Sequence, residues 1–329
     1  MLKFRAPIRY AVAYGSGVYQ QQGYTENHQK KTMVDMVFAV THPEHWHAIN
    51  MQQHREHYSM MSRMLGSASV SFIQEKLGAG VYYNTYVEME GVQLKYGVIS
   101  VDSMTNDLLG WTSMYLAGRL HKPTLVLQDD PFIRLCEQVN LANAVRVALL
   151  MLPKNFTERE LFATIASLSY MGDFRMIYGE NPNKVRNIVD AQLPSFRELY
   201  SGTIEGFSNL KYIGMNFLQQ DMDPIVRARM LSKLPQQICT NTVKLYSRSS
   251  AYPSSLSSSS TTSSESLSNI DPALLSVVQH PELLPLFLTS SIRSIVARPA
   301  LTQSLKGIYS AGFSKSASYL WDKLNKSKL

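Results

Sequence analysis

Two neighbouring stretches decide the fold of this chain: Tyr14-Gly15-Ser16-Gly17-Val18-Tyr19 and Met33-Val34-Asp35-Met36-Val37-Phe38-Ala39-Val40. The second stretch predicts a buried strand, because apolar and β-branched residues flank a single carboxylate. A charge in the middle of such a strand costs several kcal/mol unless it is paired or binds a cation. The first stretch predicts a strand end that runs into a glycine-serine turn.

The turn predicts a cradle for phosphate. Glycine lets backbone N–H groups approach a phosphate closely, and Ser16 adds a hydroxyl. A carboxylate on the adjacent strand is a suitable ligand for Mg²⁺ bound to that phosphate. We therefore expect Tyr14, Gly15, Ser16 and Gly17 to bind a nucleotide, and Asp35 to be the catalytic metal ligand.

A glycine-serine turn followed by a strand aspartate resembles the polymerase-β-like nucleotidyltransferases. Over a longer span the chain resembles the mitochondrial CDP-diacylglycerol synthases of the translocator assembly and maintenance family. Further motifs that carry this resemblance lie at residues 78–84, 95–100, 116–123, 170–175 and 305–308. The resemblance implies an α/β (α+β) fold. It consists of a nucleotidyltransferase domain with a mixed sheet, a small, mainly helical domain that resembles a winged helix, and a C-terminal amphipathic helix.

The resemblance also implies the reaction. A phosphate oxygen of phosphatidate attacks the α-phosphorus of CTP, which gives CDP-diacylglycerol and pyrophosphate with Mg²⁺ as cofactor. A phosphate monoester has a second pKa near ~6, so the nucleophile is already charged and needs no general base. Catalysis then depends on alignment and charge neutralisation. Asp35 would hold the metal against the nucleotide phosphates, and the turn would bind the leaving pyrophosphate.

The expected setting follows from the same resemblance. The implied partners are CTP, phosphatidate and an anionic membrane surface, with no nucleic acid, and the sequence carries no indication of the oligomeric state. The implied location is peripheral, on the matrix side of the mitochondrial inner membrane, where the product feeds cardiolipin synthesis. Lys3, Arg5 and Arg9 precede the first acid and resemble the edge of a mitochondrial presequence.

Two features depart from the general nucleotidyltransferase pattern. The second carboxylate expected two residues after Asp35 is replaced by Val37, and a polar insert at residues 20–31 lengthens the gap after the turn. The metal therefore needs a carboxylate from elsewhere. Asp102 and Asp107 are the candidates because they follow a predicted strand; the alternative for Asp107 is to cap a helix that runs to Leu120.

A hairpin turn is predicted at residues 90–91, between strands at residues 81–87 and 92–101. Lys95 lies in the second of these strands. It either reaches out to water along its aliphatic stem or contacts phosphate in a nucleotide-binding and catalytic role. Both interpretations are open at the level of sequence.

Asp173 and Arg175 are predicted on one side of an extended segment. Either they form an internal ion pair, or Arg175 binds the nucleotide or lipid phosphate with its geometry fixed by Asp173. Capping boxes at residues 41–44 and 157–160 predict helix starts, the first helix running to about Met64. Arg119 and Lys122 are interpreted as ordinary charges at the end of a helix.

Composition divides the chain. The predicted units are residues 1–128 (nucleotidyltransferase domain), 129–248 (helical domain), 249–268 (serine-rich flexible linker) and 269–329 (C-terminal segment). Residues 289–329 hold seven Lys/Arg against one acid, within a net charge of +7 for the chain. This distribution favours an anionic partner for the tail and argues against a broad nucleic-acid groove on the body.

The last segment, 301–328, predicts an amphipathic helix that lies on a membrane surface. The residues expected to contact the membrane are Leu305, Ile308, Phe313, Lys315, Leu320, Trp321 and Lys323. Lys306 is placed on the polar side of this helix. The alternative is a terminal helix packed on the protein core. No run approaches the eighteen apolar residues that a spanning helix needs.

Histidines and cysteines give weaker indications. Five of the eight histidines fall within residues 42–57; they predict either a metal site at His54 and His57 or, as we favour, a solvated or nucleotide-facing helix surface. Cys136 and Cys239 offer neither a zinc quartet nor a disulfide framework. Two other functions stay open: a nucleotidyltransferase acting on RNA or a small soluble acceptor, and a non-catalytic scaffold attached to a membrane.

Overall fold

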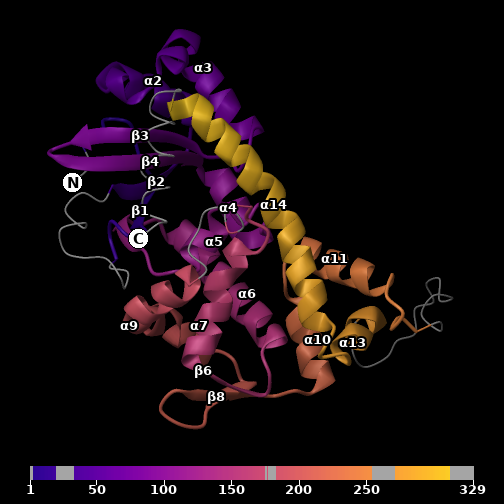
Figure 1. Cartoon of the computed structure of the whole chain (residues 1–329). Helices are drawn as coiled ribbons and strands as arrows, with labels where there is room; N and C mark the ends of the chain where they lie inside the picture. Colours follow the sequence, from indigo (N-terminus) through magenta and orange to yellow (C-terminus); the bar gives the residue numbers. More distant parts are fainter. Residues whose placement is uncertain (1–2, 20–32, 175, 177–182, 254–270, 312–329) are drawn as a thin grey trace.

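The computed structural model describes residues 3–19, 33–174, 176, 183–253 and 271–311 (Figure 1). Its larger sheet has five strands in the order β3-β4-β2-β1-β5. The strands are β1 (Tyr10–Tyr14), β2 (Val34–Val40), β3 (Tyr82–Met89), β4 (Val92–Ser100) and β5 (Leu125–Gln128). β2 and β4 are parallel and the other pairs antiparallel. The sheet is mixed, and the expected α/β class is confirmed.

Both faces of this sheet are covered, because alternate residues of β2 point to opposite sides. Val37 and Ala39 pack in the core beneath α4 (Val101–Gly110), α5 (Ala117–Leu120) and α6 (Pro131–Met151). Phe38 and Val40 pack on the other side, with Trp46 of α2 (Pro43–Gln53). Beyond α2 follow η1 (Arg55–His57) and α3 (Met60–Lys76), which is kinked at Gly66.

The second half of the chain is mainly helical and carries a small sheet in the order β6-β8-β7. These strands are β6 (Asn155–Thr157), β7 (Leu210–Tyr212) and β8 (Phe217–Gln220). The helices are α7 (Glu158–Ser167), η2 (Leu168–Tyr170), α9 (Lys184–Glu205), α10 (Pro224–Ser232), α11 (Gln236–Tyr246) and α13 (Pro272–Val278). Figure 1 shows this sheet at the opposite end of the molecule from α2 and α3. The boundaries proposed between domains stay predictions.

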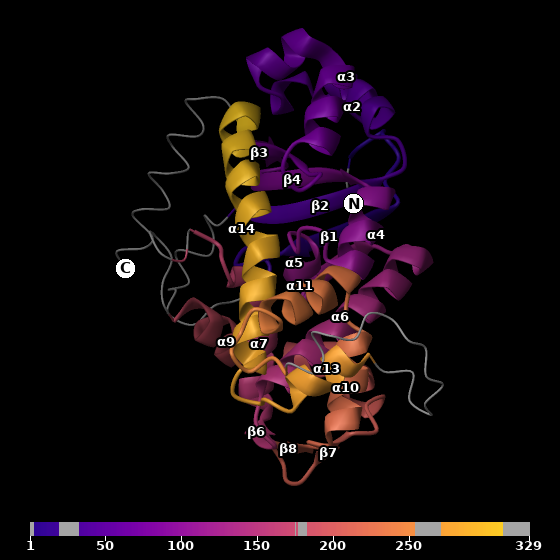
Figure 2. The same ribbon diagram turned by 90° about the vertical axis from the view of Figure 1, so that its right-hand side faces the viewer.

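One long helix, α14 (Leu284–Ala311), runs along one side of the molecule, from the level of α13 to the edge strand β3 (Figures 1 and 2). Leu284, Leu288 and Ile292 are fully buried in the main core. The expected terminal helix thus begins at Leu284, not at residue 301, and its first part packs on the protein. Within the described residues, none of the helices combines the length and apolar content that crossing a bilayer requires.

The predicted helix starts are confirmed with one correction. Thr157 and Glu160 form both bonds of a capping box. At residue 43 the helix begins as predicted, but its N-cap residue is His42 and no side chain caps it. That helix ends at Gln53 instead of about Met64, and α3 begins separately after a Ser59 cap. The predicted hairpin is confirmed: Glu90 and Gly91 both adopt positive φ between β3 and β4.

Candidate active site

The glycine turn and the strand carboxylate lie side by side. β1 pairs antiparallel with β2 so that Tyr14 is opposite Asp35. Gly15, the next residue, has φ +82°, and a Cβ placed on it would lie 3.7 Å from Asp35 Oδ2. The chain then curls back, with the N–H groups of Val18 and Tyr19 donating to the Gly15 carbonyl. The turn therefore sits directly against the carboxylate, as the sequence predicts.

Lys95 faces the same carboxylate. The parallel register of β2 and β4 sets Asp35 opposite Lys95, and Lys95 Nζ lies 3.0 Å from Asp35 Oδ1. The ammonium also stands over the Tyr83 ring, 4.7 Å from its centroid. Both charged side chains are largely shielded from solvent, so Lys95 does not reach out to water. A cation adjacent to the carboxylate and the turn suits an anionic ligand.

One oxygen of Asp35 has unused capacity. Oδ1 is shielded from solvent and accepts no hydrogen bond from the described residues, and its charged neighbour is Lys95, whose Nζ forms an ion pair with it at 3.0 Å. A shielded carboxylate oxygen without a donor is costly unless a cation completes it. Mg²⁺ is commonly held by one or two carboxylates together with substrate phosphates and water. Asp35 fits that role. β2 offers no second carboxylate, and Val37, which stands where the general pattern has one, is buried in the core.

Three tyrosines and an arginine form the wall beside this pair. The hydroxyls of Tyr14 and Tyr83 are 3.2 Å apart. The Arg119 guanidinium stacks on Tyr115, at 4.0 Å from its ring centroid, and lies 5.3 Å from that of Tyr14. Arg119 Nη1 donates to the Tyr115 carbonyl, but Nε is buried without a hydrogen bond among the described residues. Arg119 lies in the last turn of α5, as the sequence interpretation expects, but its contacts with two tyrosine rings set it apart from an ordinary helix-end charge.

A second cation lies behind Arg119, where the two halves of the molecule meet. Lys122 Nζ donates to the Gly118 carbonyl and to Ser169 Oγ at 2.5 and 2.9 Å. Burial, and then the nearby Arg119, lower the pKa of Lys122 to about 7. α5 approaches η2 so closely that a Cβ on Gly118 would lie 2.3 Å from Ser169 Cβ. Tyr19 at the end of the turn is likewise near α9: burial and Glu198 raise its pKa.

Asp107 is a structural carboxylate. It is buried and accepts six hydrogen bonds from the loop before α5, at 2.7–3.2 Å. The donors are the backbone N–H groups of Ser113, Met114, Leu116 and Ala117 and the hydroxyls of Thr112 and Ser113. Asp107 lies within α4 and does not cap a helix that runs to Leu120, so that alternative is wrong. By holding the loop it fixes Tyr115 and the start of α5, which carries Arg119.

Asp102 lies at the far end of β4 from Asp35, and both Asp107 oxygens already accept hydrogen bonds, so their roles as metal ligands stay predictions. Asp102 lies in the exposed first turn of α4, beyond Ser100 at the end of β4. Ser100 is five residues beyond Lys95, which corresponds to about 16 Å along a strand. The Asp35 site is at the other end of β2 and β4. This separation favours a site in which Asp35 is the strand's sole carboxylate ligand.

Comparison with known proteins decides the family. The family described as "Phosphatidate cytidylyltransferase, mitochondrial" matches residues 1–326. The chain belongs to this family. Relatives with that same name come from Schizosaccharomyces pombe (39% identical; 99% of this chain, 82% of the relative), Danio rerio (38%; 98% and 92%) and Xenopus laevis (38%; 98% and 91%). The enzyme class inferred from the sequence, a nucleotidyltransferase, is thereby confirmed.

The remaining predicted site residues of this cytidylyltransferase are placed differently. Residues 170–174 form turns and not an extended segment: Gly172 has φ +83°, and the Asp173 N–H donates to the Tyr170 carbonyl. Asp173 is buried, and Arg175 lies outside the described residues. The extended-segment prediction is therefore wrong, while the roles of Asp173 and Arg175 stay predictions.

The predicted membrane helix is only partly described. Leu305 is exposed, as expected. Lys306, expected on the polar side, is buried and donates to the Leu77 and Gln74 carbonyls at 2.5 and 3.3 Å, which corrects that placement. Burial lowers its pKa to about 7. The Ile308 side chain and residues Phe313, Lys315, Leu320, Trp321 and Lys323 lie outside the described part of the chain.

The histidine-rich region does not form the expected solvated surface throughout. His47 is buried between the Tyr58 hydroxyl and the Gln74 amide, and burial lowers its pKa to about 4. His57 is buried against the Tyr96 hydroxyl. In the described ranges, one group of at least three potential metal ligands lies close together: His54, Glu56 and His57. This group is on η1 and next to it, and does not include Asp35.

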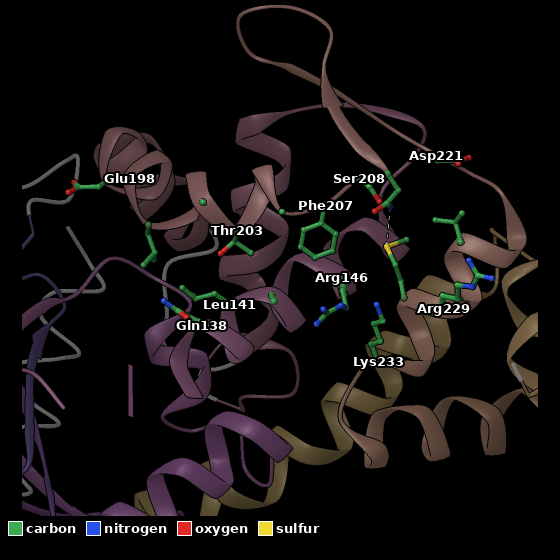
Figure 3. A pocket seen from close by; sticks show the side chains of 17 residues that line it. Gln138, Leu141, Arg146, Glu198, Thr203, Phe207, Ser208, Asp221, Arg229 and Lys233 are labelled. Carbon is green, nitrogen blue, oxygen red and sulfur yellow. Dashed lines mark hydrogen bonds between the residues drawn. The ribbon is translucent and has the colours of Figure 1, made fainter. Parts of the chain in front are cut away.

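A large cavity lies in the helical half, apart from Asp35. It has a volume of about 960 Å³, is open to solvent, and is lined mainly by α6, α9, α10 and residues 206–209 before β7. Figure 3 shows Arg146 between Phe207 and Lys233 within it. Arg146 Cζ lies 5.6 Å from the centroid of the Phe207 ring. None of the site residues predicted from sequence lines this cavity.

Proposed function

We propose that this chain transfers CMP from CTP to phosphatidate in a Mg²⁺-dependent reaction, at the site formed by Asp35, Lys95 and the Gly15 turn. The observation that carries the proposal is the close approach of Gly15 to Asp35, whose Oδ1 is shielded and accepts no hydrogen bond. The family membership supports the same reaction. Asp35 would hold the ion, which when bound neutralises charge on the nucleotide phosphates.

The chain's own groups would align the reactants. A phosphatidate oxygen forms a bond to the α-phosphorus of CTP as the bond to the β-phosphate oxygen breaks, and pyrophosphate leaves. The N–H groups and hydroxyl of the Gly15–Gly17 turn face the departing phosphates. Lys95 and Arg119 supply fixed positive charge to phosphate oxygens, and because both lie against aromatic rings their positions are set before substrate arrives.

We further propose that the enzyme works as a peripheral protein on the matrix side of the inner membrane, where its product serves cardiolipin synthesis. The mitochondrial names of its relatives support this compartment, and the basic C-terminal segment supports an anionic surface. Protease protection in intact and opened mitochondria, combined with carbonate extraction, tests the proposal. If added protease degrades the protein when only the outer membrane has been opened, the proposal is contradicted.

The reaction is tested with purified protein, CTP labelled at the α-phosphate and vesicles that contain phosphatidate. The expected result is label in the lipid phase as CDP-diacylglycerol, with equal release of pyrophosphate and loss of both when Mg²⁺ is chelated. Label transferred to RNA or to a soluble acceptor instead would overturn the choice of substrate. Absence of any CTP-dependent transfer would favour the scaffold alternative.

A further inference from the structure

The outer face of α3 is an exposed apolar surface. We use this name for Met60, Met61, Met64, Leu65 and Phe72. Met64, Met60 and Phe72 are 77%, 72% and 63% exposed, and the other two are at least half exposed. Single exposed apolar residues are normal, but a cluster of large ones indicates a contact surface. Four of these residues lie before the kink at Gly66, and Phe72 lies in the segment after it.

Two of the three buried side chains of α3, Ser62 and Gln74, are polar, and the third, Val70, packs with Tyr58 and Tyr82. Ser62 is fully buried and its hydroxyl lies 2.7 Å from the Tyr82 hydroxyl. Gln74, also fully buried, hydrogen-bonds His47 Nε2 through Oε1. α3 thus departs from the usual arrangement, in which a surface helix buries its apolar side and exposes its polar side, because two of its three buried side chains are polar and its largest apolar side chains are exposed. The polar pairs and Val70 hold α3 on the body and leave the exposed apolar side chains available for another contact.

The composition of α3 favours lipid as that contact. Between Glu56 and Glu75, Arg63 is the one Asp, Glu, Lys or Arg side chain in the sequence. A nearly uncharged surface of Met, Leu and Phe enters the boundary between headgroups and acyl chains without burying carboxylates. Interfaces between proteins are enriched in Arg and carry polar groups at their rim, whereas Arg63 is the one charged side chain that this stretch offers.

The neighbouring element extends the surface. The far end of α14 lies beside the end of α3 in both views (Figures 1 and 2), where Lys306 donates to the Leu77 and Gln74 carbonyls. Leu301 and Leu305 on this end of α14 are at least half exposed. The basic C-terminal sequence continues from the same end of α14. The apolar surface and the positive tail therefore start from one end of the molecule.

We propose that the outer face of α3 docks on a phospholipid bilayer and, with the end of α14, seats the enzyme on the membrane that holds its lipid substrate. The proposal deepens the proposed function, since a lipid substrate makes membrane seating useful. The docking itself is independent of turnover. Because the face is nearly uncharged, its share of binding does not require anionic lipid and resists salt.

The test is vesicle flotation of the full chain with the double variant Met64→Glu/Phe72→Glu. The matched control is Met215→Glu/Phe217→Glu, which makes the same change at another exposed apolar site, beside β8 at the opposite end of the molecule. On pure phosphatidylcholine vesicles at high salt, we expect the α3 variant to lose binding by about tenfold or more. The control variant should bind like the unaltered chain, and thermal unfolding of both variants checks their fold.

Several outcomes would overturn the proposal. One is equal vesicle binding by the α3 variant and the unaltered chain; another is loss of binding by the control alone. A third is a dimer without lipid that the α3 variant dissociates, which would make a second copy the occupant of the face. Turnover of a short-chain, water-soluble phosphatidate separates the two proposals: docking without turnover contradicts the reaction, and turnover without docking contradicts the membrane face.

Discussion

Asp35 and Asp107 are two shielded carboxylates that the protein treats in opposite ways. Asp107 accepts six hydrogen bonds, so its lone pairs are filled by the loop that it holds. Asp35 has a neighbouring lysine, a glycine turn and an oxygen that accepts no hydrogen bond from the described residues. A carboxylate with its hydrogen bonds complete serves the fold, whereas one with unused capacity can serve a ligand. Replacing Asp35 should therefore lower activity more than stability, and replacing Asp107 should lower stability first.

The largest expected effect is on turnover in Asp35→Asn. The variant keeps the shape of the side chain but loses the charge that would hold the metal, so kcat/KM should fall about 10³-fold or more, equivalent to about 4 kcal/mol. Its free energy of unfolding should fall less than that of Asp107→Asn, because Asp35 gives up one ion pair, with Lys95, where Asp107 gives up the charge that accepts six hydrogen bonds. Glu88→Gln, at an exposed position on β3, is the control. Equal losses of activity in both variants would contradict the assignment.

Asp107→Asn should act on stability first. The amide loses the charge and turns an N–H₂ group toward N–H donors, so we expect the free energy of unfolding to fall by about 3 kcal/mol or more. Urea denaturation at constant m-value measures this loss. Asp102→Asn, in the same helix but exposed, should change it by less than about 0.5 kcal/mol. An Asp107→Asn protein as stable as the unaltered chain would remove the contrast with Asp35.

The pH dependence of stability sharpens the structural side of the comparison. His121 follows the loop that Asp107 holds, and burial lowers its pKa to about 3; for His47 burial lowers it to about 4. Below pH 6.5 the unfolded chain binds protons that these folded side chains exclude. The free energy of unfolding should therefore fall as the pH falls from 6.5 toward 4, by about 1 kcal/mol per pH unit for each histidine. Denaturant midpoints across this range measure it.

His47→Gln is the variant for this titration, since an amide can still pair with the Tyr58 hydroxyl or the Gln74 side chain. It should reduce the slope of the free energy of unfolding against pH by the contribution of one histidine. His45→Gln, two residues away on the same helix but exposed, should leave the slope unchanged. A slope that neither variant changes would assign the acid sensitivity to other groups.

The smallest expected effect comes from a pair of glycines. Gly15→Ala and Gly91→Ala each place a side chain at positive φ, +82° and +77°, so both should lose about 1 kcal/mol of stability. A Cβ on Gly15 also approaches Asp35 Oδ2, whereas one on Gly91 meets nothing within 4 Å. We expect about a tenfold loss of activity in Gly15→Ala alone. Similar activities in the two variants would show that the turn does not need to approach the carboxylate.

Local patterns predicted the parts of the site that are close in sequence. The turn and the Asp35 strand are neighbours along the chain, so antiparallel pairing was enough to bring Gly15 to the carboxylate. The helix cap at Thr157 was likewise visible in its own few residues. The opposition of Lys95 to Asp35 required the parallel register of β2 and β4, which no short pattern encodes.

Other features depended on contacts between distant elements. Arg119 belongs to the site because α5 brings it to Tyr14, and α5 is held by a loop whose shape includes positive φ at Met114. The role of Asp107 follows from that loop and not from its own neighbours in sequence. The break between α2 and α3 was also not predicted, because the helix that starts at residue 43 was expected to run to about Met64.

The packing of α14 implies that the chain can be cut between α11 and α13 and that the two pieces will still associate. Two glycines at positive φ meet this helix, Gly172 against Arg293 and Gly78 against Gln303, and in both places a Cβ would overlap it. These contacts set the position of α14 along its axis at two separate points. They do not involve residues 254–270, which lie between α11 and α13 in sequence. Polypeptides 1–253 and 271–329, produced together but unlinked, should therefore find each other and reconstitute one particle.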